Sequence, residues 1–175
     1  MRILGIDCGT ATTGWAVIEP IVSNHKTEQK EGKSGTGEAK YKVPVVIACG
    51  VINTHKFSPE EDRLRDLGES LLEIIVEFSP QDLAIEDIYF FKNAKTVIKV
   101  SQARGVVIYN AVKSNLKCFS YTPLQVKNIV TGYGKADKKQ VMEAVNDIFH
   151  LGGKLTQDDA ADALAVAYSH YMSLR

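Results

Sequence analysis

Short apolar-rich runs separated by polar turns recur along this chain, and they predict strands. Runs of this length bounded by glycine, proline or polar residues are typical of buried strands. They lie at residues 2–7, 14–19, 45–52, 82–86 and 117–121. The first three follow one another without a helical pattern between them, which predicts an antiparallel meander. The last two each follow a helical pattern, which predicts parallel strands joined through helical crossovers.

Apolar residues at helical spacing occupy much of the remaining chain. The clearest stripe runs from Leu64 to Phe78 and predicts a helix with one face in the core. Further helices are predicted at about 93–115, 122–131, 137–151 and 156–174. The whole pattern predicts a single α/β domain over residues 1–175, built on a five-stranded mixed sheet that is flanked by helices.

Residues 23–42 interrupt this pattern. They include five lysines, three glutamates and three glycines, and almost no apolar side chain. A segment of this composition does not bury a core, so we expect a mobile hairpin loop or a disordered insertion within the domain.

The composition narrows the class of protein. No apolar run approaches the roughly 20 residues that a membrane span requires, and Asp7 ends the first run too early for a signal peptide. The three cysteines are scattered and lack the spacing of zinc ligands, so we expect small buried thiols. We therefore expect a cytoplasmic protein with no membrane partner.

The charge is unevenly distributed, although the 21 basic and 21 acidic residues cancel over the whole chain. Residues 88–140 contain ten lysines and arginines and one acid, Asp137, which leaves 11 basic and 20 acidic residues elsewhere. A localised positive segment is typical of proteins that bind a phosphate backbone. Some of these lysines are expected on solvated helix faces in any protein.

Four acidic residues are candidates for one shared site. Asp7 and Glu86 end the first and fourth predicted strands, and Asp159 and Asp162 lie three residues apart in an alanine-rich helix. If the two strands are neighbours, their carboxyl ends form the crevice where α/β sheets bind ligands. Converging carboxylates repel one another unless a cation neutralises them, and oxygen-rich sites suit Mg²⁺. The pattern predicts metal-dependent phosphoryl transfer.

Each acid also has an ordinary structural explanation. Thr156 and Asp159 have the spacing of a capping box at a helix N-terminus, which is an alternative to catalysis as the role of Asp159. Asp7 precedes Cys8 and Gly9 and could be a turn residue. Glu86 could be a solvated strand end. Their order and settings together favour the shared site.

Several segments together resemble the RuvC family of bacterial Holliday junction resolvases, which have the ribonuclease H-like fold. The segments that carry the resemblance are Ile3–Thr10, Ala84–Glu86, Lys92–Ala94, Gln102–Gly105, Gln125–Lys127 and Asp159–Ala165. The resemblance spans nearly the whole chain. It implies a homodimeric, Mg²⁺-dependent endodeoxyribonuclease that nicks two opposed strands of a four-way DNA junction symmetrically, in recombination and repair. It also implies partners for branch migration of the RuvA and RuvB type.

The resemblance also implies roles for individual residues. Asp7, Glu86, Asp159 and Asp162 match the family's metal ligands, for two Mg²⁺ ions per subunit with Mn²⁺ as a substitute, in a two-metal hydrolysis. Lys127 and Lys138 match basic residues near the cleavage site, which gives a catalytic set of six. The residues expected to contact DNA are Tyr89, Lys92, Asn93, Arg104, Lys135 and Lys139.

The chain departs from the family pattern in three places. Cys8 replaces the usual proline after Asp7, which we expect to alter turn stiffness more than chemistry. The 23–42 segment is longer than the corresponding family hairpin. Asp158 is an additional acid, so the sequence leaves open whether Asp158 or Asp159 binds metal.

Three other functions remain open from the sequence. Asp7, Gly9 and Thr10 also resemble the phosphate-binding turn of actin-like and sugar-kinase ATPases, but those proteins need a second such domain. A non-catalytic junction-binding protein of the same fold is the second alternative. The third is a related nuclease that acts on other branched or RNA-containing substrates.

Overall fold

The computed structural model describes residues 1–9, 11–21, 42–88 and 94–175. Within these ranges the strands are β1 (Ile3–Asp7), β2 (Thr12–Glu19), β3 (Val45–Asn53), β4 (Asp82–Glu86) and β5 (Lys117–Tyr121). The helices are α1 (Glu60–Phe78), α2 (Ala94–Lys113), α3 (Pro123–Thr131), α4 (Lys138–Ile148) and α5 (Asp158–Ser173). The expected elements are therefore present, and their bounds differ from the predicted ones by a few residues.

The sheet has the predicted mixed topology, with the strand order β3-β2-β1-β4-β5. β1 to β3 form the antiparallel meander, and the pairs β1–β4 and β4–β5 are parallel. In this register Asp7 lies opposite Gly14, and Ile6 lies beside Ile85. The first and fourth strands are therefore neighbours that point the same way.

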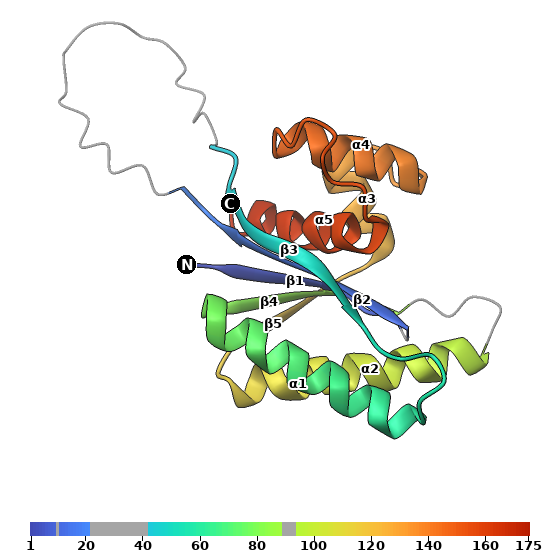
Figure 1. Cartoon of the computed structure of the whole chain (residues 1–175). Coiled ribbons are helices and arrows are strands. Elements are labelled where there is room, and N and C mark those ends of the chain that lie inside the picture. Colours follow the sequence, from blue (N-terminus) through green and yellow to red (C-terminus); the bar gives the residue numbers. More distant parts are fainter. Residues whose placement is uncertain (10, 22–41, 89–93) are drawn as a thin grey trace, which may run out of the picture.

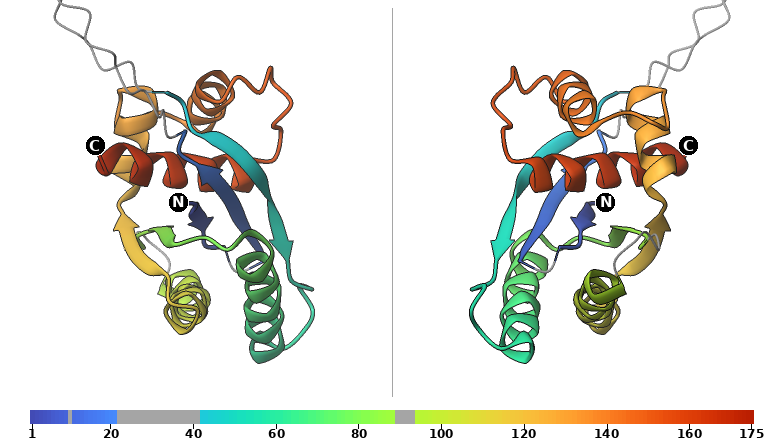
Figure 2. Two further views of the ribbon diagram at one scale, coloured as in Figure 1. Left: turned by 90° about the vertical axis from the view of Figure 1, so that its left-hand side faces the viewer. Right: turned by 90° about the vertical axis from the view of Figure 1, so that its right-hand side faces the viewer.

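Helices cover both faces of the sheet (Figures 1 and 2). α5 lies directly on one face with α3 and α4 outside it, and α1 and α2 cover the other face. The alternation of side chains along β1 separates two cores, because Ile3 packs with α5 whereas Leu4 and Ile6 pack with α1 and α2. By the same alternation, Asp7 faces the α5 side of the sheet.

Small residues let α5 approach the sheet closely. A Cβ atom at Gly5 would lie 2.3 Å from the Ala163 carbonyl oxygen and 2.7 Å from the Ala167 Cβ. At Gly14 it would lie 1.8 Å from the carbonyl oxygen of Asp159. Any side chain at these glycines would displace the helix, so glycine is required by the close approach.

A buried polar chain attaches the other end of α5 to the sheet. The Tyr121 hydroxyl lies 2.8 Å from His170 Nδ1, and His170 Nε2 lies 3.1 Å from an Asp82 carboxylate oxygen. Phe119 stacks on the imidazole with ring centroids 4.2 Å apart. Buried polar groups are costly unless they are paired, and here they pair with one another across α5, β4 and β5.

The start of α5 excludes the structural alternative for Asp159. Thr156 and Asp159 do not form a capping box, because the helix begins at Asp158 and its N-cap is Gln157, with no side-chain capping bond. Thr156 therefore precedes the cap, and Asp159 lies in the first turn. By contrast, Asp137 and Gln140 form a capping box at the start of α4.

Some predictions concern residues outside the described ranges. These are nearly all of the 23–42 insertion and three of the expected DNA contacts, Tyr89, Lys92 and Asn93. In the part of the chain that the structure describes, none of the helices combines the length and the apolar character needed to cross a bilayer.

Candidate active site at the carboxyl ends of β1 and β4

Two parallel neighbouring strands bring the first two acids together. Asp7 and Glu86 are the last residues of β1 and β4, and the residues before them pair in register. Both face the α5 side of the sheet, because Ala84, two residues before Glu86, packs in the α5 core. Their carboxyl groups share a hydrogen bond.

The first turns of α5 bring the other two acids to the same end. The backbone of Asp159 lies on Gly14, which is the strand partner of Asp7. Asp162 follows one helical turn later, on the side that faces Lys138 at the start of α4. The structure therefore places all four predicted acids at one end of the sheet, where β1, β4 and the start of α5 meet.

The electrostatics of Asp7 and Glu86 reflect this convergence. Burial raises the pKa of Asp7 to about 6, with repulsion from Asp162 and Asp159 adding to the effect and Lys138 opposing it. Burial also raises the pKa of Glu86 to about 8, together with the nearby charge of Asp7. Both groups therefore resist ionisation in the absence of a neutralising cation.

Two lysines partly neutralise the crevice. Lys138 Nζ lies 3.7 Å from an Asp162 carboxylate oxygen, and Asp162 raises the pKa of this lysine. Burial raises the pKa of Asp162 itself, and Lys138 opposes that rise. Lys127, on α3, lowers the pKa of Glu86. The structure thus brings both predicted catalytic lysines to the acids.

The donor set fits a hard divalent cation. It offers carboxylate oxygens alone, since burial raises the pKa of the Cys8 thiol to about 12 and keeps it protonated. Among the described residues no group of three acids, histidines or cysteines is already drawn together closely enough to hold a metal. Burial first, and repulsion between the acids second, nevertheless raise the pKa values of Asp7 and Glu86, and a bound cation would favour their ionised forms.

The structure also separates the two acids at the start of α5. Asp159 is half-buried and is among the charges that act on Asp7, whereas the Asp158 side chain is exposed. Cys8 is partly buried against the α1 and α2 core, and Cys49 is also partly buried. Cys118 is exposed at the start of β5, so the expectation of three small buried thiols is wrong for this residue.

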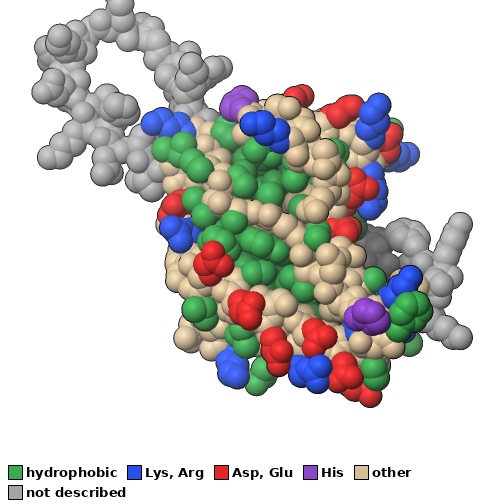
Figure 3. Space-filling model, in the orientation of Figure 1, with side chains coloured by type: hydrophobic (Ala, Val, Ile, Leu, Met, Phe, Trp, Pro, Cys, Tyr) green, Lys and Arg blue, Asp and Glu red, His purple; other side chains and the backbone are tan. Residues whose placement is uncertain are grey.

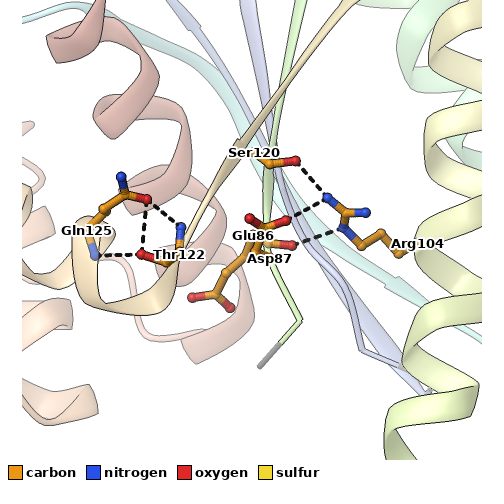
Figure 4. A network of polar contacts seen from close by, with 6 residues as sticks. All are labelled: Glu86, Asp87, Arg104, Ser120, Thr122 and Gln125. Atoms are coloured by element: carbon orange, nitrogen blue, oxygen red, sulfur yellow. Dashed lines mark hydrogen bonds and ion pairs between the residues drawn. The ribbon is translucent and has the colours of Figure 1, made fainter. Parts of the chain in front are cut away.

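The described DNA-contact candidates lie in different settings. Lys135 is exposed in the turn before α4, and Lys139 is exposed and lies 3.7 Å from Glu143. Arg104 is different, because its guanidinium is held within the protein by Glu86, Asp87 and Ser120 (Figure 4).

Sequence reasoning did not find the partners of Arg104 or the buried chain around His170. Asp87 looked like one more strand-end acid, and Ser120 carries no motif. His170 did have a detectable signal, since it lies on the same face of α5 as the buried alanines Ala163 and Ala167. Its partners, however, come from strands that are distant in sequence.

A mixed sheet of this order, with carboxylates from β1, β4 and α5 at one end, defines a nuclease of the ribonuclease H-like class. The family model described as "Crossover junction endodeoxyribonuclease RuvC" matches residues 30–170. The chain belongs to the RuvC family of crossover junction endodeoxyribonucleases.

The similar proteins cover almost the whole chain. The RuvC of Fusobacterium nucleatum subsp. nucleatum is 40% identical over 174 residues, which is 99% of this chain and 82% of the relative. The RuvC of Finegoldia magna is 41% identical over 170 residues, which is 97% of this chain and 92% of the relative. The structure of Thermus thermophilus RuvC in complex with Holliday junction substrate superposes with a TM-score of 0.81 at 26% identity. The superposition covers 100% of this chain and 95% of the Thermus chain. This family membership rejects the ATPase interpretation.

Proposed function

We propose that this chain resolves four-way DNA junctions by nicking two opposed strands symmetrically, with Asp7, Glu86, Asp159 and Asp162 as its metal ligands. The observation that carries the proposal is the convergence of these four acids at one end of the sheet in a RuvC-family chain. The Thermus thermophilus relative in complex with a Holliday junction supports four-way DNA as the substrate.

The acids would hold Mg²⁺, two ions per subunit, with Mn²⁺ as a substitute. Asp7 is the proposed shared ligand, because its carboxyl group shares a hydrogen bond with Glu86 and is also close enough to Asp159 and Asp162 for their charges to raise its pKa. Bound metal supplies a hydroxide nucleophile at neutral pH and stabilises the leaving 3′ oxygen.

The lysines act on the phosphate. Lys138 is exposed beside Asp162, and Lys127 lies on α3 near Glu86, so both can offset the charge that develops on the scissile phosphate. Lys135 and Lys139 extend the positive surface next to Lys138 and are proposed to contact the DNA backbone.

Paired nicks require two active sites, so we propose a homodimer. An exposed apolar stripe on α2 supports this, because Ile98, Tyr109 and Val112 lie on one side of the helix and are about 60% exposed. A second copy with the same stripe would cover it in a twofold arrangement. Partners for branch migration of the RuvA and RuvB type follow from the family and are part of the proposal.

Cleavage of a synthetic four-way junction beside a linear duplex tests the function. With Mg²⁺, the wild-type protein should produce paired symmetric nicks in the junction only. Asp7→Asn should still bind the junction but cut it about 10²–10³-fold more slowly, because metal ligation contributes several kcal/mol to transition-state stabilisation. Asp62→Asn, at a partly exposed acid on α1 that pairs with Arg65, is the matched control and should cut normally. Equal cutting of the duplex, or full activity of Asp7→Asn, would reject the proposal.

A further inference from the structure

The guanidinium of Arg104 joins three acceptors at the carboxyl end of β4 (Figure 4). One terminal nitrogen lies 2.8 Å from an Asp87 carboxylate oxygen and 2.7 Å from the Ser120 hydroxyl on β5. The Nε–H donates to the carbonyl oxygen of Glu86, with the two heavy atoms 3.4 Å apart. A single side chain from α2 therefore contacts the last residue of β4, the residue after it, and the neighbouring strand.

Asp87 is held through its backbone as well. Its N–H donates to the carbonyl oxygen of Tyr121, the last residue of β5, at 2.8 Å. Both the main chain and the side chain of Asp87 are thus fixed against β5 and α2. The planar guanidinium suits this task, because it presents several donors in a rigid arrangement that an ammonium group lacks.

Holding Asp87 also fixes the direction of Glu86. Successive side chains along a strand point to opposite faces. Asp87 is held on the α2 side of the sheet, and in Figure 4 the Glu86 carboxylate leaves the strand on the side away from the guanidinium. A rotation of the chain at Asp87 would turn the Glu86 carboxylate away from Asp7.

We propose that Arg104 is a positioning residue, which fixes the end of β4 so that the Glu86 carboxylate faces the metal site, and which holds Asp87 away from that site. This inference rests on the proposed metal-dependent function and deepens it. The resemblance to known resolvases suggested a DNA contact for Arg104, but its side chain is only 21% exposed, and its Nε and one terminal nitrogen bind Glu86, Asp87 and Ser120.

Direct binding of Mn²⁺ to the DNA-free protein, followed by calorimetry, tests the inference without relying on cleavage. Arg104→Met should weaken Mn²⁺ binding about tenfold or more, because residues that orient metal ligands are typically worth 10–100-fold in affinity. Arg104→Lys should not restore it, since an ammonium group cannot span the three acceptors. Asp87→Asn should have a smaller effect in the same direction. Arg65→Met, at an exposed α1 arginine that also pairs with acids, is the control and should bind Mn²⁺ normally.

Junction binding without divalent ions separates positioning from DNA contact. Positioning predicts that Arg104→Met binds the junction within about twofold of wild type, with the same salt dependence. A phosphate contact predicts weaker binding and a slope of log K against log salt that falls by about one. A phosphate contact also predicts that Asp87→Asn, which releases Arg104, does not weaken Mn²⁺ binding. Weaker junction binding by Arg104→Met with a reduced salt slope, or unchanged Mn²⁺ binding by Asp87→Asn, would overturn the inference.

Thermal melts complete the experiment. A purely architectural role predicts a lower melting temperature with unchanged Mn²⁺ affinity of the folded protein, and that result would also overturn the inference. If Arg104→Met fails to fold, Ser120→Ala removes one acceptor and carries the same test. If the wild-type protein binds Mn²⁺ but does not cut junctions, the proposed function fails, whereas the positioning role is still decided by the Mn²⁺ affinities.

Discussion

At the residue scale, Asp7 and Glu86 occupy positions that disfavour their charged forms. Each is the last residue of a buried strand, and each faces the other across neighbouring strands. Their raised pKa values mean that the folded, metal-free protein holds protons that the unfolded chain would release. Ionising the two carboxylates therefore lowers the stability of the folded protein unless a cation binds them.

This cost of ionisation predicts an unusual pH dependence of stability in EDTA. The ordinary pKa values of 3.8 for Asp7 and 4.5 for Glu86 rise to about 6 and about 8 on folding. The contribution of these groups to stability should therefore be fully present below about pH 4 and should be lost as the pH rises toward 8. Asp7→Asn removes much of the repulsion, so at pH 8 it should be more stable than wild type by about 1–3 kcal/mol.

Urea unfolding at pH 5 and pH 8 measures this effect. The advantage of Asp7→Asn should be smaller at pH 5, and Mg²⁺ at pH 8 should stabilise the wild type but not the variant. Asp62→Asn should follow the wild-type pH profile. A variant that is less stable than wild type at pH 8 in EDTA would contradict the electrostatic account.

At the element scale, α5 carries half of the proposed ligands and depends on two different attachments. Gly5 and Gly14 allow the first half of the helix to lie on the strands, and the buried Tyr121–His170–Asp82 chain fixes the second half. Because the helix is rigid, its contact with the sheet determines where Asp159 and Asp162 stand relative to Asp7.

Gly14→Ala should therefore damage the site as well as the fold. The new Cβ would lie 1.8 Å from the Asp159 carbonyl oxygen, so the start of α5 must move. We expect a loss of about 1–3 kcal/mol in unfolding free energy, as for other overpacked sites, and cleavage reduced further than the loss of folded protein explains. Gly50→Ala on the neighbouring strand is the control and should have a smaller effect, since the atoms nearest to its Cβ belong to the Trp15 ring and lie 3.3 Å away. Normal cleavage by folded Gly14→Ala would show that α5 position is not critical.

At the scale of the whole molecule, charge and apolar surface divide the protein into distinct faces. Figure 3 shows a row of acidic side chains along α1, whose exposed acids are Glu61, Glu69, Glu73 and Glu77. The exposed lysines Lys135, Lys138 and Lys139 lie instead at the start of α4, next to the acidic crevice. A polyanion should therefore approach from the α4 side and be repelled by α1.

The α2 stripe predicts how the molecule assembles. Val112 is 58% exposed within the stripe, and Val112→Glu should place a charge in the proposed subunit interface and produce a monomer. Sedimentation at micromolar concentration measures the assembly, and junction cleavage by the monomer should give single, unpaired nicks. Val76→Glu, at a 77% exposed apolar residue on α1, is the control and should remain a dimer. A Val112→Glu protein that stays dimeric would place the interface elsewhere.

Local signals in the sequence determined the elements and the chemical character of the site. Apolar periodicity is a property of neighbouring residues, so it predicted the sheet, its meander and the helices. The four acids were identified because their order and settings together favour one shared site, although each of them alone has an ordinary structural explanation. The sequence left a capping box open as an alternative for Asp159, because Thr156 has the required spacing, and only the observed helix start excludes it.

The tertiary structure alone decided which side chains meet. The closeness of Asp159 to Asp7 depends on a glycine in β2, and the role of Arg104 depends on the register of β4 and β5, which places Ser120 and Asp87 within its reach. These contacts join residues 16 to 152 positions apart, and their energies depend on distance and burial in the folded chain. No local pattern encodes such distances, so the sequence specified the groups that could act, and packing specified which of them act together.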